Sequence, residues 1–238
     1  ILYTGLVRTK NMQPVLGILG GMGPLATLDF IKNIYKSTPQ VRVDSDHMRI
    51  ISDINVKIPS RTRSVLLGEE SPSAQMIKSI EGLAAIGAKY VAVPCNSAHY
   101  FYDDVNPLLS IEWINMLKIV SDRVRLLGGS NVLILGGYVT VTEKIYDEHL
   151  QQTCYLSAKE NELVYSLIED IKLSRGNYEQ SVKEVIQFYK NTKADTVVLA
   201  CTELTEVVEL FEGNGLRVVD SNLVYAESLI DLVFNAHV

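Results

Sequence analysis

Short apolar runs alternate with longer amphipathic segments along most of the chain. The apolar runs are rich in Val and Ile and lack polar alternation, which is typical of parallel strands buried on both faces. The order of strand and helix predicts an α/β protein built from parallel sheets with right-handed crossovers. The predicted strands are residues 15–19, 48–52, 90–93, 132–135, 196–199 and 216–219, and the predicted helices are residues 25–36, 74–86, 160–173 and 178–189.

The chain contains two similar halves. The sequence ILGG closes a predicted strand at residues 18–21 and again at residues 134–137. A strand ending in cysteine follows each copy, with Cys95 in YVAVPCNS and Cys201 in TVVLACTEL. Chance similarity between apolar strands explains either match alone, but the same two features in the same order favour duplication of one α/β unit. The boundary is expected near residues 114–127, and the last strand and helix could pack on either half.

Composition limits the possible classes of function. The chain has 238 residues, of which 47% are hydrophobic, enough for a substantial core in one large domain or two compact ones. A formal charge of −6 with scattered basic residues argues against a nucleic-acid partner. No apolar run approaches the roughly 20 residues that span a bilayer, and residues 1–11 lack the apolar core of a signal peptide. We therefore expect a cytoplasmic protein with no membrane partner, and three cysteines without a disulfide framework.

Cys95 and Cys201 are the strongest candidates for chemistry. Functional groups of parallel α/β sheets lie beyond the carboxyl ends of the strands, so two facing halves would place both thiols across one cleft. Asn96 and Ser97 follow the first cysteine and Thr202 follows the second. Backbone amides at the start of helices there would bind a carboxylate and lower the pKa of each thiol from about 8.5. A lone strand-end cysteine is more often a small buried hydrophobe, but a matched pair favours chemistry.

The glycine-rich turn after the first strand has two interpretations. Gly21, Gly23 and Ala26 fit the G-x-G-x-x-A pattern of dinucleotide sites. Pro24 removes one of the helix-start amides that a pyrophosphate would use, and no strand clearly ends in an acidic residue at the expected spacing. We therefore interpret the glycines as a tight turn that lets a substrate approach the backbone at Met22 and Gly23.

Two further residues have ordinary structural explanations. His99 lies one helical turn beyond Cys95 and could tune its thiol, although a structural histidine is the more frequent case. Cys154 has no matching polar neighbours, so we interpret it as a small packing residue. No group of Cys and His has the spacing of a zinc site.

Five motifs stand in order along the chain, namely GILGGMGPLAT at 17–27, DSDH at 44–47, IPSRT at 58–62, PCNSAHYF at 94–101 and ACTEL at 200–204. Together they resemble the cofactor-independent aspartate/glutamate racemase family, and most of all its aspartate racemase branch. The resemblance spans roughly residues 15–235, and five ordered motifs make it specific.

The resemblance implies a fold and a domain organisation. It predicts two flavodoxin-like three-layer α/β/α domains with parallel sheets, related by pseudo-twofold symmetry, in a protein that usually forms a homodimer. The first domain would comprise residues 14–115 and 221–238, and the second residues 116–220. Residues 1–13 would be an N-terminal extension.

The resemblance also implies the reaction. Cys95 and Cys201 would exchange the α-proton of an acidic amino acid, aspartate or else glutamate, without pyridoxal phosphate, another cofactor or a metal. Racemisation removes a weakly acidic proton on one face and delivers one on the other, so two acid/base groups on opposite faces are the minimal apparatus. Cys201 would act on the L enantiomer and Cys95 on the D enantiomer. Arg61 would hold the distal carboxylate, and the full set of expected substrate-binding residues is Met22, Gly23, Arg61, Asn96, Ser97, Thr202 and Glu203.

Some positions depart from the family pattern. Ser97 stands where Thr is usual, and Tyr138 follows two glycines where small and hydroxyl residues are usual. A lysine that aspartate racemases offer near the start of the helix at residue 160 is not clearly aligned, with Asn161 at that point and Lys159 two residues earlier.

Other functions remain open for this sequence. The alternatives to an acidic amino-acid racemase are a maleate cis-trans isomerase or a hydantoin-type racemase on the same scaffold, or a non-catalytic or dinucleotide-binding α/β module.

Overall fold

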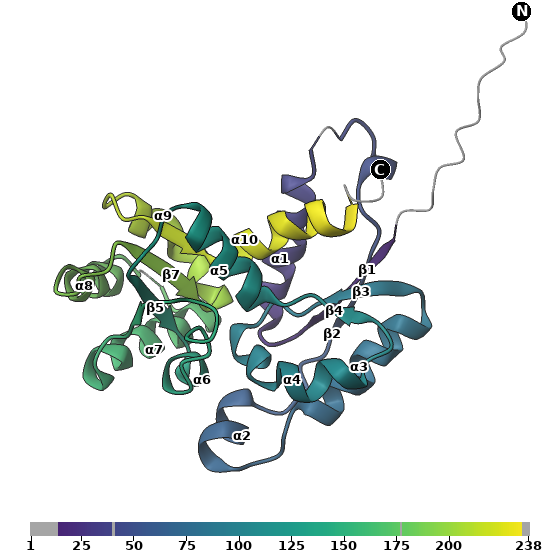
Figure 1. Ribbon diagram of the computed structural model, residues 1–238, viewed down its shortest axis with the longest axis horizontal. Coiled ribbons are helices and arrows are strands. Elements are labelled where there is room, and N and C mark those ends of the chain that lie inside the picture. The colour runs from purple at the N-terminus through teal and green to yellow at the C-terminus, as the bar shows by residue number, and fades with distance from the viewer. Residues whose placement is uncertain (1–13, 40, 177, 235–238) are drawn as a thin grey trace, which may run out of the picture.

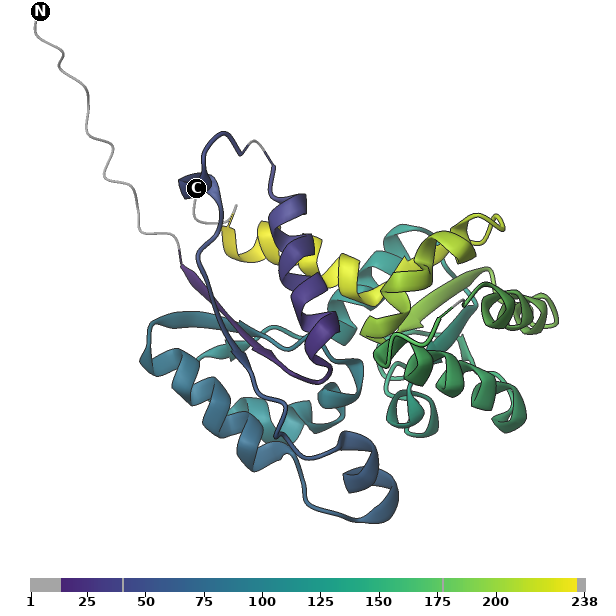
Figure 2. The same cartoon turned by 180° about the vertical axis from the view of Figure 1, so that it is seen from behind.

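The protein consists of two parallel four-stranded sheets that lie side by side, each with helices on both faces (Figures 1 and 2). The computed structural model describes residues 14–39, 41–176 and 178–234, so the predicted extension at 1–13 lies outside the described residues. The prediction of two α/β/α domains with parallel sheets is confirmed.

The elements follow the chain as alternating strands and helices. The first sheet has the order β2 (Ile50–Ile54), β1 (Val15–Gly20), β3 (Ala88–Ala92) and β4 (Glu112–Trp113), and the second has the order β6 (Thr153–Cys154), β5 (Val132–Gly136), β7 (Thr196–Ala200) and β8 (Val218–Asp220). The α-helices are α1 (Pro24–Ser37), α2 (Arg61–Leu67), α3 (Ser73–Ala85), α4 (Tyr102–Val105), α5 (Met116–Leu126), α6 (Tyr138–Thr142), α7 (Ala158–Lys172), α8 (Glu179–Lys190), α9 (Val208–Glu212) and α10 (Ser221–Leu229). Two 3₁₀-helices matter for the site, η2 (Asn96–Phe101) and η4 (Thr202–Val207).

The two sheets have the same strand order. In each half the first strand pairs on one side with the second strand and on the other with the strand that precedes the cysteine, and all of these pairs are parallel. This equivalence supports duplication of one unit. The strand expected at 48–52 begins two residues later, at Ile50, and Met48 is instead a buried core residue before the strand.

Three hydrophobic clusters, counted over the described residues, hold the layers together. The central cluster contains residues of β1 and α1 as well as β5, α5 and α10, so it is shared by both sheets. A second cluster lies on the other face of the first sheet, under α3, and a third lies under α7 and α8 on the other face of the second sheet. The two cysteine-bearing strand ends are therefore held by one continuous core.

The C-terminal helix α10 returns to the first half of the chain. It packs against α1 and α5 (Figure 1), where Tyr225 stacks on Phe30 with ring centroids 5.3 Å apart and Arg123 pairs with Glu227 at 3.0 Å. The contact with Phe30 joins the last helix to the proposed first domain, whereas Arg123 lies in the proposed second domain, so α10 packs on both halves. We retain the division into residues 14–115 with 221–238, and residues 116–220, as a proposal.

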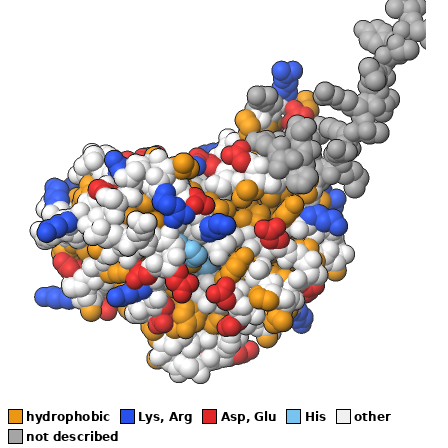
Figure 3. All heavy atoms as spheres, in the orientation of Figure 1, with side chains coloured by type: hydrophobic (Ala, Val, Ile, Leu, Met, Phe, Trp, Pro, Cys, Tyr) orange, Lys and Arg blue, Asp and Glu red, His pale blue; other side chains and the backbone are white. Residues whose placement is uncertain are grey.

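The surface bears charges of both signs. Basic and acidic side chains are interspersed over the described part of the face in Figure 3. Among the described helices, none has the length and apolar character needed to cross a bilayer.

Candidate active site

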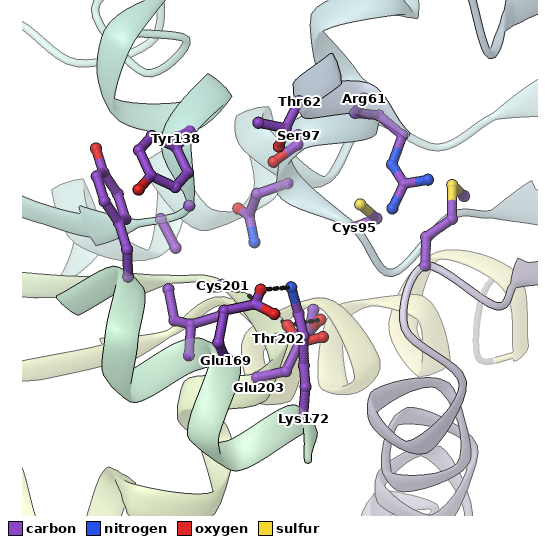
Figure 4. Close-up of a pocket in the computed structure, with 16 residues that line it drawn as sticks. Arg61, Thr62, Cys95, Ser97, Tyr138, Glu169, Lys172, Cys201, Thr202 and Glu203 are labelled. Carbon is purple, nitrogen blue, oxygen red and sulfur yellow. Dashed lines mark hydrogen bonds and ion pairs between the residues drawn. The ribbon is translucent and has the colours of Figure 1, made fainter. Parts of the chain in front are cut away.

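Cys95 and Cys201 occupy equivalent places in the two halves. Each follows the carboxyl end of a central strand, with extended backbone (φ −157° and −141°), and each directly precedes a 3₁₀-helix, η2 or η4. Both side chains line a single cavity between the domains (Figure 4), with about 590 Å³ of empty space when its mouth is included. The sequence expectation that the two thiols meet at one cleft agrees with this placement.

Most of the expected site residues line this cavity. Gly23 is the exception, since it borders a neighbouring pocket on the other side of Thr202 and Glu203. The expected residues that line the cavity are Met22, Arg61, Cys95, Asn96, Ser97, Cys201, Thr202 and Glu203. The residues that sequence reasoning missed are Thr62, Gly137, Tyr138, Tyr165, Ile168, Glu169, Lys172 and Ala200.

The turn after β1 brings the backbone of Met22 to the cavity. Gly21 has a φ of +92°, and a Cβ on it would lie 2.5 Å from the carbonyl carbon of Asn55, so only glycine fits. Thr27 fixes the turn, because its hydroxyl accepts from the Gly21 amide at 3.1 Å and donates to the Gly23 carbonyl at 2.7 Å. These contacts favour the interpretation of the glycines as a tight turn.

The Cys201 thiol faces a carboxylate. Its Sγ donates to Oε2 of Glu203 at 3.0 Å. Burial, then the charge of Glu203 and its hydrogen bond, raise the pKa of Cys201 well above the ordinary value, although the charge of Lys172 acts in the opposite direction. The expectation that helix-start amides lower this pKa is therefore wrong, because desolvation and a neighbouring anion outweigh the backbone field.

Lys172 reaches the cavity from the last turn of α7. It pairs with Glu169 at 2.7 Å. Burial lowers the pKa of Lys172, but the hydrogen bond to Glu169 and the charges of Glu203 and Cys201 outweigh burial, so this pKa is raised and the ammonium stays charged. The lysine of this site thus comes from the C-terminal end of the helix. At the other end, Asn161 is buried and donates to the Leu156 carbonyl at 2.9 Å.

Arg61 is the second cation of the cavity. It is the first residue of α2, and its Nη1 donates to the Pro59 carbonyl at 3.1 Å. Its Nε is buried without a hydrogen-bond partner, and no ion pair to Arg61 is present among the described residues. A guanidinium with unused donors beside a cavity suits a carboxylate ligand.

An aromatic pair forms another wall. The rings of Tyr138 and Tyr165 stack with centroids 3.6 Å apart, and the Tyr138 hydroxyl donates to Glu162 at 3.3 Å. Tyr138 lies across the cavity from Arg61 in Figure 4. The departure from the family pattern at Tyr138 therefore places a large ring on the cavity wall.

His99 connects the loop that contains Cys95 to the start of α5. Its Nε2 accepts from the Met116 amide at 3.1 Å, which leaves Nδ1 to donate to the Cys95 carbonyl at 2.9 Å. Burial lowers the pKa of His99 to about 4, so the ring is neutral near pH 7. The structural interpretation of His99 is thus favoured over direct tuning of the thiol.

Comparisons with known proteins group the chain with racemases. The family model described as Asp/Glu/Hydantoin racemase matches residues 19–229. The chain belongs to this family. It is 24% identical over 229 residues to the broad specificity amino-acid racemase RacX of Bacillus subtilis (strain 168), a match that covers 91% of this chain and 96% of that protein.

Solved structures of racemases have the same fold. The aspartate racemase of Picrophilus torridus is 27% identical, with a TM-score of 0.83 over 92% of this chain and 94% of that one. An aspartate racemase homologue from Pyrococcus horikoshii OT3 is 21% identical, with a TM-score of 0.74 over 93% of this chain and 99% of that one. Glutamate racemase isoform RacE1 of Bacillus anthracis is 16% identical, with a TM-score of 0.70 over 94% and 83%. The protein is thus an isomerase, an amino-acid racemase, and not a non-catalytic or dinucleotide-binding module.

Proposed function

We propose that this racemase interconverts the L and D enantiomers of an acidic amino acid, aspartate first and glutamate second, with Cys95 and Cys201 as the two acid/base groups. The observation that supports this most strongly is that the two thiols reach one cavity from the ends of equivalent strands in different domains. Two bases on opposite faces of one carbon are what inversion requires.

Each direction of the reaction uses one cysteine as a thiolate base and the other as a thiol acid. With the L enantiomer, the Cys201 thiolate takes the α-proton and becomes a thiol, while the Cys95 thiol gives its proton to the opposite face and becomes a thiolate. The D enantiomer reverses these roles. The raised pKa of Cys201 favours its thiol form, and this form is the acid that the D substrate needs. The assignment of each thiol to an enantiomer rests on the family resemblance.

Two cations would hold the two carboxylates of the substrate. The buried Nε of Arg61 has no hydrogen-bond partner among the residues that the structure describes, and we assign Arg61 to the distal carboxylate, because a planar fork binds a carboxylate bidentately. Lys172 would neutralise part of the charge that develops on the α-carboxylate as the proton leaves. Backbone and side-chain donors of Asn96, Ser97 and Thr202 would complete this carboxylate site.

Glu203 would bind the substrate ammonium. Its Oε2 accepts from Cys201 at 3.0 Å and from Thr202 at 3.3 Å, but its Oε1 is buried without a hydrogen-bond partner in the described part of the chain. An ammonium beside Glu203 would also offset the negative charge that raises the pKa of Cys201, so substrate binding would favour the thiolate.

The reaction needs no cofactor in this proposal. Two thiols supply both proton transfers, so activity should survive dialysis against a chelator and hydroxylamine, and should need a reducing agent because thiolates oxidise readily. Loss of activity on dialysis that pyridoxal phosphate restores would contradict the proposal.

Chiral chromatography of reactions with L-aspartate, L-glutamate and L-alanine tests the proposal directly. We expect D-aspartate to form at the highest rate, D-glutamate more slowly, and D-alanine at a small fraction of either rate. Absorbance at the maleate band in a parallel reaction tests the isomerase alternative. Equal rates for alanine and aspartate would contradict the acidic substrate, and maleate turnover without racemisation would contradict the reaction.

We further propose a homodimer. Light scattering coupled to size-exclusion chromatography should give about twice the 26.5 kDa of one chain. A mass of a single chain over the micromolar range would contradict it.

A further inference from the structure

A buried chain of hydrogen bonds joins the two cysteine-bearing segments. The Tyr146 hydroxyl donates to Oδ1 of Asn96 at 2.6 Å, Nδ2 of Asn96 donates to the Ser221 hydroxyl at 3.0 Å, and that hydroxyl donates to the Leu199 carbonyl at 2.7 Å. Asn96 directly follows Cys95, and Leu199 lies in β7, two residues before Cys201. The side chains of Asn96 and Ser221 therefore connect the segment that follows Cys95 to the strand that precedes Cys201, and Tyr146 holds the other end of the Asn96 amide.

The hydrogen bonds from Tyr146 through Asn96 and Ser221 to the Leu199 carbonyl can run in one direction only. The Leu199 carbonyl accepts and cannot donate, so the single hydroxyl hydrogen of Ser221 goes to it. The Ser221 oxygen can then only accept from Asn96, which must present its NH₂ group there. The amide oxygen consequently faces Tyr146, whose pKa burial raises well above 10, so that the phenol keeps its proton. The orientation of the Asn96 amide is thus fixed by its two neighbours.

This orientation leaves one donor for a ligand. Asn96 lines the cavity, and the described residues provide no second acceptor for its Nδ2. Tyr146 and Ser221 are fully buried and Asn96 is 3% exposed, so water has little access to replace either partner. A flipped amide would turn a carbonyl oxygen toward the substrate carboxylate and would repel it.

We propose that Tyr146 and Ser221 are positioning residues of the racemase, which act through Asn96 by aiming its second N–H at a substrate carboxylate and by fixing the Cys95 loop to β7. This inference rests on the proposed function, since it takes the ligand to be an amino-acid carboxylate. Neither residue touches the cavity, so neither contacts the substrate.

Conservative variants test the proposal. Tyr146→Phe and Ser221→Ala each remove one hydroxyl, and each should lower kcat/KM about tenfold, as expected for loss of one hydrogen bond that orients a ligand donor. Matched controls are Tyr225→Phe, which removes an equally buried hydroxyl bonded to the Ile114 carbonyl, and Ser121→Ala, which removes a buried hydroxyl that has no hydrogen-bond partner among the described residues. Both controls should keep kcat/KM within about twofold of the parent protein, even where thermal stability falls.

A double-mutant cycle separates positioning from general loss of structure. In an Asn96→Ala background, adding Tyr146→Phe or Ser221→Ala should change kcat/KM less than about twofold, because the residue they act through is gone. If either substitution lowers kcat/KM by the same factor in the Asn96→Ala background as in the parent protein, the inference is overturned. Single variants with parental kinetics would also overturn it. Both outcomes leave the proposed function intact. A parent protein that racemises none of the amino acids would instead overturn the proposed function.

Discussion

The thiol of Cys201 donates to a carboxylate oxygen of Glu203, with Sγ and Oε2 3.0 Å apart at the start of η4. The two residues are separated by one position, so the local backbone fixes this contact. A carboxylate beside a thiol stabilises the protonated form, and burial of the thiol acts in the same direction. The protonated form of Cys201 is therefore favoured, and its conversion to a base depends on the charges around it.

Replacement of Glu203 by Gln should lower the pKa of Cys201. The variant keeps the size of the side chain but removes the negative charge that, after burial, contributes most to the raised pKa. Alkylation of Cys201 by iodoacetamide, followed by mass spectrometry of the peptide that contains it, should reach half-maximal rate at lower pH than in the parent protein. An alkylation profile that stays in place or moves to higher pH would show that Glu203 does not control this thiol.

Replacement of Lys172 by Met should move the same profile in the opposite direction. The ammonium of Lys172 lowers the pKa of Cys201, so its removal should raise that pKa further and slow alkylation near neutral pH. Lys183→Met is a matched control, because Lys183 also pairs with a glutamate on a helix surface, Glu179 in α8, but does not line the cavity. An equal shift in both variants would mean that general loss of positive charge is responsible.

The buried, hydrogen-bonded ring of His99 should make the stability of the protein depend on pH. The folded pKa of about 4 lies below the unfolded value of about 6.5, so the contribution of the neutral ring is complete above pH 6.5 and is lost as pH falls toward 4. His99→Gln keeps one donor and one acceptor without this titration. We expect the free energy of unfolding of the parent protein relative to the variant to fall by about 3 kcal/mol between pH 7 and pH 4.

Urea denaturation at both pH values measures this difference. The comparison with the variant is necessary because burial raises the pKa of Asp220 to about 6, and that carboxyl group contributes the opposite slope between pH 4 and 6. A pH-independent difference between the two proteins would mean that His99 titrates alike in the folded and unfolded states.

The sequence predicted the central strands better than the edges of the sheets. β1, β5 and β7 are almost wholly buried, and β3 is buried at Val91 and Ala92 after the exposed Lys89, so these strands contain apolar runs that are easily recognised. β4 and β6 have two residues each, too few for any periodicity, and neither was predicted. α5 also escaped prediction, because it occupies the region that was interpreted as the boundary between the halves.

The residues of the site also divide into those that the sequence could place and those that it could not. Residues adjacent to the cysteines could be placed from sequence because they follow strands whose carboxyl ends meet at one edge of the sheet. Lys172 and Tyr165 could not, since they lie on α7 and reach the cavity only through its packing against β5. Likewise, the raised pKa of Cys201 depends on burial and on the orientation of Glu203, neither of which a motif specifies.

Replacement of Arg61 by Ala should raise KM for aspartate by about 30-fold or more. The substrate carboxylate would lose its charged partner inside a cavity, a loss of roughly 2–5 kcal/mol by analogy with buried ion pairs at interfaces. Arg61→Lys should have an intermediate effect, because the charge remains but the bidentate fork is lost. Arg63→Ala is the control, since Arg63 is exposed and pairs with Glu69. Unchanged kinetics in Arg61→Ala would exclude Arg61 from substrate binding.

Single replacements of the two cysteines should separate the two halves of the reaction. If Cys95 and Cys201 flank the α-carbon, alanine at either position abolishes inversion, because one face then lacks its acid/base group. The remaining thiol can still exchange the proton on its own face. In deuterated water, Cys95→Ala should therefore introduce deuterium into the L substrate without inversion, and Cys201→Ala should do so with the D enantiomer, as measured by proton NMR and chiral chromatography.

The controls distinguish this mechanism from a structural role of the thiols. The double variant should catalyse neither exchange nor inversion, whereas Cys154→Ala should racemise at the parental rate, because the half-buried Cys154 lies in β6 and does not line the cavity. If the two cysteines served only in packing, their replacement by alanine would lower the stability of the protein by about 1 kcal/mol and leave catalysis nearly intact. Substantial racemisation by Cys95→Ala would therefore disprove the paired-thiol mechanism and assign that face of the substrate to another group in the cavity, such as the Ser97 hydroxyl.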